Sequence, residues 1–451
     1  MMRSWLAAMR GQLAQQAQQP QQAQPSNSWH ADNGGGGGMG GSLGDAIQHC
    51  QDGVFTRLQM LVADLSTMHR GQVVQIGASA HLQHQIAAGQ LAAALSYRQA
   101  VQQAATAACL LPPGYLATHP IAGGAMGRLA VVAVALESCQ LAITRAQGSG
   151  GAAGLEGDIS ASNSAMAVAV LEVAHAASTL LEQPQHQGRP SGVGSATADA
   201  AQRSVKMACN FSADLCLVAE ACGSPAGMAA AGELAARAFC CALGLPGSVA
   251  AQALCECWGR LGSIASHDAS TQKAELILQL AAGGALAATT QQGLAAVQAH
   301  MESESYAQLR DTVAATLSAA ARLLAEREGC AGDAGELPYP ATAEELQARA
   351  MQLLPRLEAA AAAGTQERAV QRCLALSQRK CAYLGCTNVA LLAGPLPGVP
   401  PADAPRPRRC GGCRRVRYCS EECCRADWRA HRRACRALAA QAEAAGQGGE
   451  A

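Results

Sequence analysis

Cysteine and histidine gather near the C-terminal end of this sequence at spacings that suit metal binding. Seven cysteines and one histidine between residues 381 and 435 follow the order C-x4-C, a long gap, then C-x2-C-x5-C-x3-C-x7-H-x3-C. A structural zinc ion takes four such ligands in a tetrahedron, and short spacings let two side chains of one turn reach the same ion. Eight ligands therefore predict two zinc ions. The predicted ligands are Cys381, Cys386, Cys410, Cys413, Cys419, Cys423, His431 and Cys435.

The ligands and the residues between them resemble the MYND-type zinc finger. The densest part of the resemblance is CGGCRRVRYCSEECCRADWRAHRRAC at 410–435, and the whole covers 55 of 451 residues. The resemblance implies two interleaved, cross-braced sites: one with Cys381, Cys386, Cys419 and Cys423, the other with Cys410, Cys413, His431 and Cys435. Such sites are closed, because all eight ligands are used and no position stays open for a catalytic water.

The resemblance also implies protein binding, because MYND fingers take short proline-containing peptides in a shallow groove. Trp428 matches a groove residue of the family, and it equally fits a small core beside Tyr418. The glutamine and serine that accompany it in peptide-binding members are replaced by Cys424 and Gly411. Cys424 also follows Cys423 directly, so a slip of one residue would exchange one thiol for the other. The x3 spacing from the preceding cysteine favours Cys423 as the ligand.

Two further features of the finger follow from its sequence. The 23 residues between Cys386 and Cys410 form a longer gap than the family would have, and their prolines indicate an exposed extended loop. From Glu421 to about Ala440 we expect a helix that places the last two ligands on one face. Because the finger has few large apolar residues, its folding energy must come largely from metal binding.

Positive charge supplies a rival hypothesis for the finger. Between Arg406 and Arg436 there are eleven arginines and three acidic residues, a net charge of +8 over 31 residues. Such density is typical of surfaces that bind phosphates, which would make the protein a nucleic-acid-associated regulator. It also suits a solvated surface that offsets the negative charge of zinc-bound thiolates. No aromatic residues alternate with the arginines for base stacking, which favours the solvated surface.

The elements that must position the finger are helices. Only 3% of the residues are aromatic, and alanine, leucine and valine supply most of the apolar surface, a composition that favours closely packed helices. Tyr306, Leu309, Val313, Leu317, Ala320 and Leu324 follow steps of three and four and predict one helix face. Thr342 and Glu345 have the spacing of a capping box for the next helix, which Pro355 should kink.

The predicted organisation is mainly α. Residues 1–45 are a Gln/Gly-rich arm expected to be disordered, residues 46–378 an all-α region of one or two subdomains, residues 379–440 the zinc finger, and residues 441–451 a disordered tail. The helical region is either an irregular bundle or an α-solenoid, since no repeat signature is found. The longest apolar stretches, such as 129–136, are interrupted too early to span a membrane, and we expect no membrane partner.

The remaining patterns bear on the cellular compartment and give no sign of an enzyme. The eleven cysteines between Cys50 and Cys330 favour free thiols in a reducing compartment, nucleus or cytosol. The first residues are mildly similar to an organelle transit peptide, although their glutamine run is atypical.

Outside the finger, the spacing of the remaining cysteines favours core positions over a third metal site for Cys255, Cys257 and the Cys240-Cys241 pair. No strand-rich sequence of a SET methyltransferase flanks the finger. The sequence therefore predicts a zinc-binding adaptor that recruits a protein partner.

Overall fold

The computed structural model describes residues 124–148, 156–182, 195–245, 247–266, 271–300, 303–329, 342–386 and 407–447. The expectations for the N-terminal arm, for residues 46–123 and for the proline-rich gap at 387–406 lie outside these ranges. The same holds for the last four residues of the tail.

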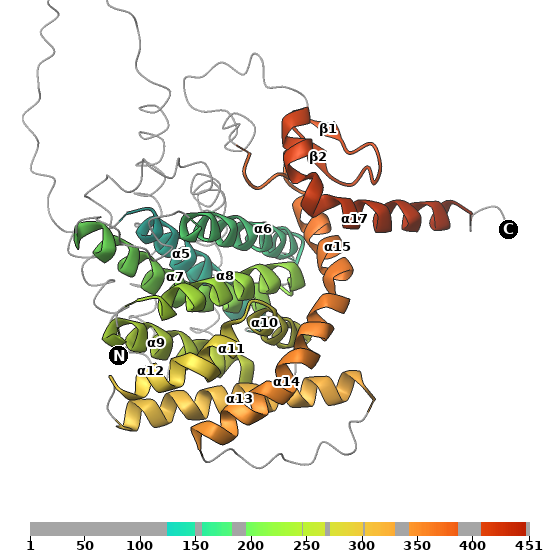
Figure 1. The fold of residues 1–451 in the computed structure, drawn as a ribbon. Helices are drawn as coiled ribbons and strands as arrows, with labels where there is room; N and C mark the ends of the chain where they lie inside the picture. The colour runs from blue at the N-terminus through green and yellow to red at the C-terminus, as the bar shows by residue number, and fades with distance from the viewer. Residues whose placement is uncertain are drawn as a thin grey trace, which may run out of the picture.

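The described part of the chain is a stack of helices with a small finger at one end (Figure 1). Its helices are α5 (Gly124–Gly148), α6 (Glu156–Leu181), α7 (Ser195–Ala221), α8 (Pro225–Leu243), α9 (Gly247–Ser266), α10 (Thr271–Ala282), α11 (Ala285–Ala288), the π-helical turn η3 (Thr289–Gly293), α12 (Leu294–Gln298), α13 (Ser303–Arg327), α14 (Ala343–Ala363), α15 (Thr365–Leu376) and α17 (Glu421–Gln447). Two short antiparallel strands, β1 (Arg408–Arg409) and β2 (Arg417–Tyr418), pair Arg408 with Tyr418.

The predicted helix signals are confirmed in α13 and α14. In α13 the apolar stripe faces the core, and its members Leu309, Val313 and Leu317 are all buried. At the start of α14, Thr342 Oγ1 accepts the amide of Glu345 and the Glu345 carboxylate accepts the amide of Thr342. This reciprocal capping satisfies two amides that have no partner within the helix. Pro355 lies inside α14, which is continuous across it.

Helix α8 lies at the centre of the helical region and contacts α6, α7, α9, α10, α11 and α15. In a solenoid each repeat contacts only its neighbours, so contacts between elements this distant in sequence favour the bundle. Small residues let these helices approach closely: a Cβ at Gly232 of α8 would lie 2.9 Å from Gln279 Cβ of α10. The alanine-rich composition of the chain thus reflects the small side chains that pack in its interior.

Two helices, α6 and α8, are long and apolar enough to cross a membrane by length and composition alone. In this fold, 67% and 61% of their most apolar windows are buried, because both helices contribute to the core. The sequence argument that no apolar stretch is long enough overlooked them. Their apolar residues are accounted for by packing within the helical region.

The chain reaches the finger along one side of the helical region (Figure 1). Helices α14 and α15 run from the end formed by α13 toward the finger, where α15 packs against α17. Val370, Cys373 and Leu376 of α15 are buried in the same apolar cluster as the predicted zinc ligands. Leu171 and Ala226 of the helical region join that cluster. The predicted boundary at residue 378 therefore follows a helix that already packs in the core of the finger.

Candidate metal centre

Three segments bring the predicted ligands together: the turn at 381–386, the β1–β2 hairpin and helix α17. The hairpin turn is closed by the amide of Cys410 donating to Val416 O at 2.9 Å and by the amide of Arg414 donating to Cys410 O at 3.1 Å. Arg414 has a left-handed backbone with φ of 55°. The segment at 381–386 joins the hairpin through the amide of Ala382, which donates to Arg417 O at 2.8 Å. Ligands distant in sequence are thus held on one small framework.

The eight side chains form two groups, and in each group the ligand atoms lie within 4.8 Å of one another. The first contains Cys381, Cys386, Cys419 and Cys423, and the second contains Cys410, Cys413, His431 and Cys435. These are the interleaved groups that the resemblance implies. Cys423 belongs to the first group, whereas Cys424 belongs to neither. The slip of one residue is therefore not adopted in this structure.

The distances within each group fit a tetrahedral zinc ion. Zn–S bonds of about 2.3 Å and tetrahedral angles require sulfur atoms ~3.8 Å apart, and a nitrogen ligand ~3.6 Å from a sulfur. In the first group the distances from Cys419 Sγ to Cys386 Sγ and to Cys423 Sγ are both 3.5 Å. In the second, Cys410 Sγ lies 3.7 Å from Cys435 Sγ. Two zinc ions therefore fit the geometry.

In the second group, the distance between sulfur and nitrogen also suits a zinc ion, and the backbone comes close to a ligand sulfur. Cys413 Sγ lies 3.5 Å from His431 Nε2, the distance expected across a nitrogen–sulfur edge. A Cβ at Gly412 would lie 2.7 Å from Cys435 Sγ, so glycine lets the backbone approach the cluster. Every cysteine in the described residues is a free thiol, and these sulfur separations are far beyond a disulfide bond.

Backbone and side-chain donors lower the pKa of one thiol in each group. The pKa of Cys381 falls to about 5, chiefly because the Cys386 thiol donates to it, despite its burial. For Cys410, burial raises the pKa, but the amides of Cys413 and Gly412 donate to the sulfur and the net direction is downward. Burial lowers the pKa of His431, which favours the neutral ring that a metal requires. Each group thus contains a thiol whose lowered pKa favours the thiolate form that binds a metal.

The aromatic residues of the finger have separate environments. Tyr418 is buried, and its hydroxyl donates to Asp427 Oδ2 at 2.7 Å. Trp428 is 46% exposed on α17, with its ring edge toward His431 at a centroid distance of 6.2 Å. The interpretation of Trp428 as a core aromatic is therefore wrong, because the helix turns its indole outward. Within the described residues it is the one aromatic among the exposed large hydrophobics.

The other two predicted partner-binding residues lie differently. Cys424 is half-buried on α17, one turn before Trp428, so the two share a helix face. Gly411 is exposed in the hairpin turn, and a Cβ there would meet no atom within 4 Å. The open space means that Gly411 presents no side chain where the peptide-binding members of the family have serine.

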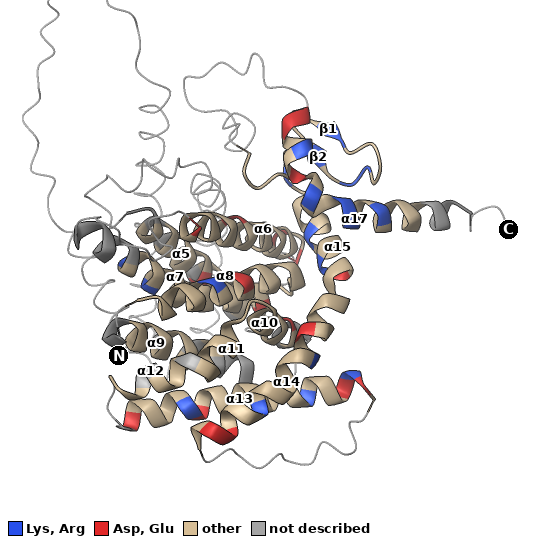
Figure 2. Cartoon of the chain, in the orientation of Figure 1, with Lys and Arg blue, Asp and Glu red and all other residues tan. Residues whose placement is uncertain are grey.

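Arginines surround the finger on both the hairpin and α17 (Figure 2). All ten between residues 408 and 436 are exposed: Arg408, Arg409, Arg414, Arg415, Arg417, Arg425, Arg429, Arg432, Arg433 and Arg436. Arg425 pairs with Glu421 at 2.6 Å, and the structure gives the other nine no ion pair within the described residues. By contrast, charged residues are sparse over much of the helical region (Figure 2).

Helix α17 is longer than the sequence indicates. It begins at Glu421 as expected but runs to Gln447, seven residues into the segment predicted to be a disordered tail. Its C-terminal part projects away from the rest of the structure (Figure 1). Alanine and glutamine after Ala440 have good helix propensity, which explains the extension, whereas the sequence argument relied on the ligand spacing alone.

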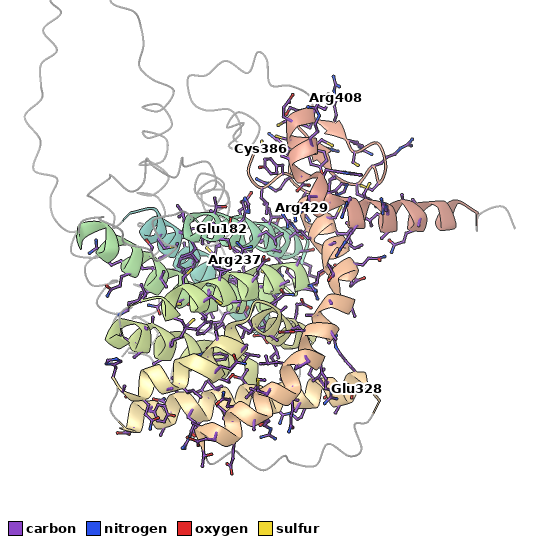
Figure 3. All side chains as sticks on the ribbon, viewed as in Figure 1. Glu182, Arg237, Glu328, Cys386, Arg408 and Arg429 are labelled. Carbon is purple, nitrogen blue, oxygen red and sulfur yellow. The ribbon has the colours of Figure 1, made fainter. Side chains whose placement is uncertain are left out.

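A buried ion pair attaches the finger to the helical region. Arg379, two residues before the first ligand, places Nε 2.8 Å from Glu172 Oε1 of α6. The two side chains are 4% and 3% exposed, and Arg379 Nη1 donates to Tyr383 O at 3.2 Å. Figure 3 shows the finger side chains, with Cys386, Arg408 and Arg429 labelled, beside the helical region that holds Glu182 and Arg237. Sequence analysis missed this contact, since no spacing rule joins residues 172 and 379.

Of the four cysteines predicted at core positions, Cys257 is buried, whereas Cys240, Cys241 and Cys255 are exposed or half-buried. Cys257 is fully buried and its thiol donates to Cys209 O at 3.1 Å, while Trp258 Nε1 donates to Thr289 Oγ1 at 3.2 Å. Cys240 is exposed and Cys241 half-buried. Across the described residues, groups with metal-site geometry occur only in the finger.

Comparison with known proteins supports the finger and gives no match for the rest of the chain. The family model described as the MYND finger matches residues 400–435. These 36 residues contain six of the eight ligands and exclude Cys381 and Cys386. No curated protein and no solved structure matches the chain. The chain therefore contains a MYND finger, a zinc-binding protein-interaction domain, on a helical region of unmatched sequence.

Proposed function

We propose that this protein is a zinc-dependent adaptor that recruits a protein partner through the surface around Trp428. The eight residues of the two groups are its zinc ligands, and the ions close the framework that presents α17. The observation that carries the proposal is the exposure of Trp428 on α17, the helix that also carries His431 and Cys435 of the second group. Tryptophan and arginine are the residues that most often dominate the energy of protein interfaces.

The surroundings of Trp428 favour a proline-containing peptide with acidic residues. The flat indole offers a surface for a proline ring, and Gly411 of the hairpin turn carries no side chain that could obstruct a peptide. Arg429, Arg432 and Arg433 follow Trp428 within two turns of α17 and have exposed guanidinium groups for carboxylates. Because the guanidinium groups are solvated, they contribute more to the association rate than to the affinity.

Binding rather than catalysis is the role that we propose for the zinc sites. Each group supplies four protein ligands, so an ion held there would have no open position for a substrate or for water. The free thiols of the described residues suit a reducing compartment, and we propose the nucleus or the cytosol.

The test is peptide binding by the full-length protein and its variants. An array of proline-containing peptides would provide a ligand, whose affinity is then measured by fluorescence anisotropy. We expect Trp428→Ala to weaken binding by roughly 30-fold, the loss of one hot-spot residue. Met351→Ala is the matched control, because Met351 is 54% exposed on α14, far along the chain from the finger. Equal affinities for the two variants would refute the role of Trp428.

Nucleic-acid binding is the second candidate, favoured by the exposed arginines of the hairpin and α17. It predicts binding of a single-stranded or duplex oligonucleotide whose affinity falls steeply with salt, since each phosphate contact releases counterions. Trp428→Ala would leave that affinity unchanged, whereas replacement of Arg432, Arg433 and Arg436 by glutamine would lower it. The two candidate functions are thus distinguished by Trp428→Ala, which should weaken peptide binding and leave oligonucleotide binding unchanged.

A further inference from the structure

A cysteine sulfur outside the seven ligand sulfurs lies against the second zinc group without belonging to it. Cys373 is on α15, ahead of the finger, and is 4% exposed. Its Sγ lies 3.7 Å from His431 Nδ1, whereas His431 Nε2 lies 3.5 Å from Cys413 Sγ. The two nitrogens of one ring therefore face different sulfurs. Nε2 faces the group that fits the ion, and Nδ1 faces the helix that leads out of the helical region.

The ring needs an acceptor at Nδ1. A neutral imidazole that binds a metal through one nitrogen carries its proton on the other. That N–H is almost always donated to a fixed partner, which sets the orientation of the ring. Carboxylates are common partners, but Asp427, on the same helix, accepts the hydroxyl of Tyr418, and the described residues show no hydrogen bond between Asp427 and His431. The atom that faces Nδ1 is Cys373 Sγ, a weak acceptor in a buried position.

We propose that Cys373 is a positioning residue of the second zinc site. Its sulfur accepts the Nδ1–H of His431 and holds the ring with Nε2 directed at the ion. This inference rests on the proposed zinc binding and adds a residue that lies outside the matched segment at 400–435. Because α15 also packs on α6 and α8, the helical region itself contributes to the zinc site. Cys373 thus adds a direct contact between the helical region and a zinc ligand to the ion pair of Arg379 with Glu172.

The test compares three variants of the full-length protein by competition for zinc with a chromophoric chelator. Cys373→Val fills a similar volume but offers no acceptor, whereas Cys373→Ser keeps an acceptor oxygen. Val370→Ala is the packing control, because Val370 lies one turn earlier on α15 and is 6% exposed in the same cluster. Circular dichroism at each zinc concentration establishes that the variants are folded.

We expect Cys373→Val to lower the affinity for one of the two zinc ions by roughly 10- to 100-fold, the usual effect of removing a hydrogen-bond partner of a metal ligand. Cys373→Ser should restore most of the affinity, and Val370→Ala should affect both ions alike. If the serine and valine variants bind zinc equally, or if Val370→Ala matches Cys373→Val, then Cys373 only fills space and the inference is refuted.

Two spectroscopic measurements extend the test, and the first needs no variant. In the wild-type protein with labelled histidine, long-range nitrogen–proton correlations must show His431 bound through Nε2 with a proton on Nδ1, and binding through Nδ1 would refute the inference. In the cobalt-substituted protein, Cys373→Val must keep the full thiolate charge-transfer band, because Cys373 is not a ligand. If the wild type binds fewer than two ions, the proposed function fails; if it binds two and the variants do not differ, only this inference fails.

Discussion

Replacing Glu172 with glutamine removes one half of the buried ion pair that joins α6 to the finger. The substitution keeps the size of the side chain and leaves the Arg379 guanidinium, 4% exposed, without its carboxylate. Such a loss costs about 3–5 kcal/mol, because the remaining charge is neither solvated nor paired. Domains are stable by only about 5–15 kcal/mol, so the substitution should remove a large fraction of the free energy of unfolding.

The assay is urea unfolding of the full-length, zinc-loaded protein, followed by circular dichroism. Glu328→Gln is the matched control, since Glu328 forms an ion pair with Arg356 at 2.5 Å in which both side chains are about half exposed. It makes the same chemical change at a solvated site and should leave the unfolding midpoint almost unchanged. The double variant Glu172→Met with Arg379→Met should recover much of the loss, because no unpaired charge remains. A Glu172→Gln midpoint equal to that of Glu328→Gln would refute the reasoning.

Three further predictions concern the finger and its contact with the helical region. Replacing Cys410 with serine should reduce the zinc bound per chain from two ions toward one, as measured by elemental analysis, and should leave most of the helical circular dichroism. Tyr418→Phe should destabilise the protein by about 1–3 kcal/mol in urea unfolding, because buried Asp427 loses its hydroxyl donor. Burial, with Arg372, Arg379 and Arg237, lowers the pKa of His175 to about 4, so between pH 6.5 and pH 4 the unfolded state binds a proton that the folded state does not. As the pH is lowered through that interval, the free energy of unfolding should therefore decrease by at most ~3 kcal/mol. Urea unfolding of wild type and His175→Gln at pH 7 and pH 5 measures this contribution, because only the wild type should show it.

The parts of this molecule that follow from local rules were predictable from the sequence. Zinc ligand spacing is a local rule, and it grouped the ligands around each ion once the family resemblance gave the interleaving. Helical periodicity is local as well, and it identified the buried face of α13. The Thr342–Glu345 capping box is the shortest-range case, since its two hydrogen bonds join residues three apart.

What the sequence did not show depends on contacts between distant segments. Cys373 resembles any other small buried residue of an amphipathic helix until α17 places His431 beside it. Glu172 sits in an apolar run of α6, and only the fold brings Arg379 to it. Trp428 presented two alternatives because its helix face depends on how α17 is held by the ligands, and the structure directs the indole outward.

These distant contacts change how zinc binding and partner binding are related. A finger attached by a flexible linker would bind zinc and present Trp428 without regard to the helical region. Here α15 enters the core of the finger, Cys373 touches a zinc ligand, and Arg379 fixes the first ligand segment to α6. Zinc binding energy is folding energy in a framework this small, so it stabilises the docked arrangement as well as the finger. The direction in which α17 presents Trp428 is therefore set by the helical region, and loss of zinc should release that orientation together with the binding surface.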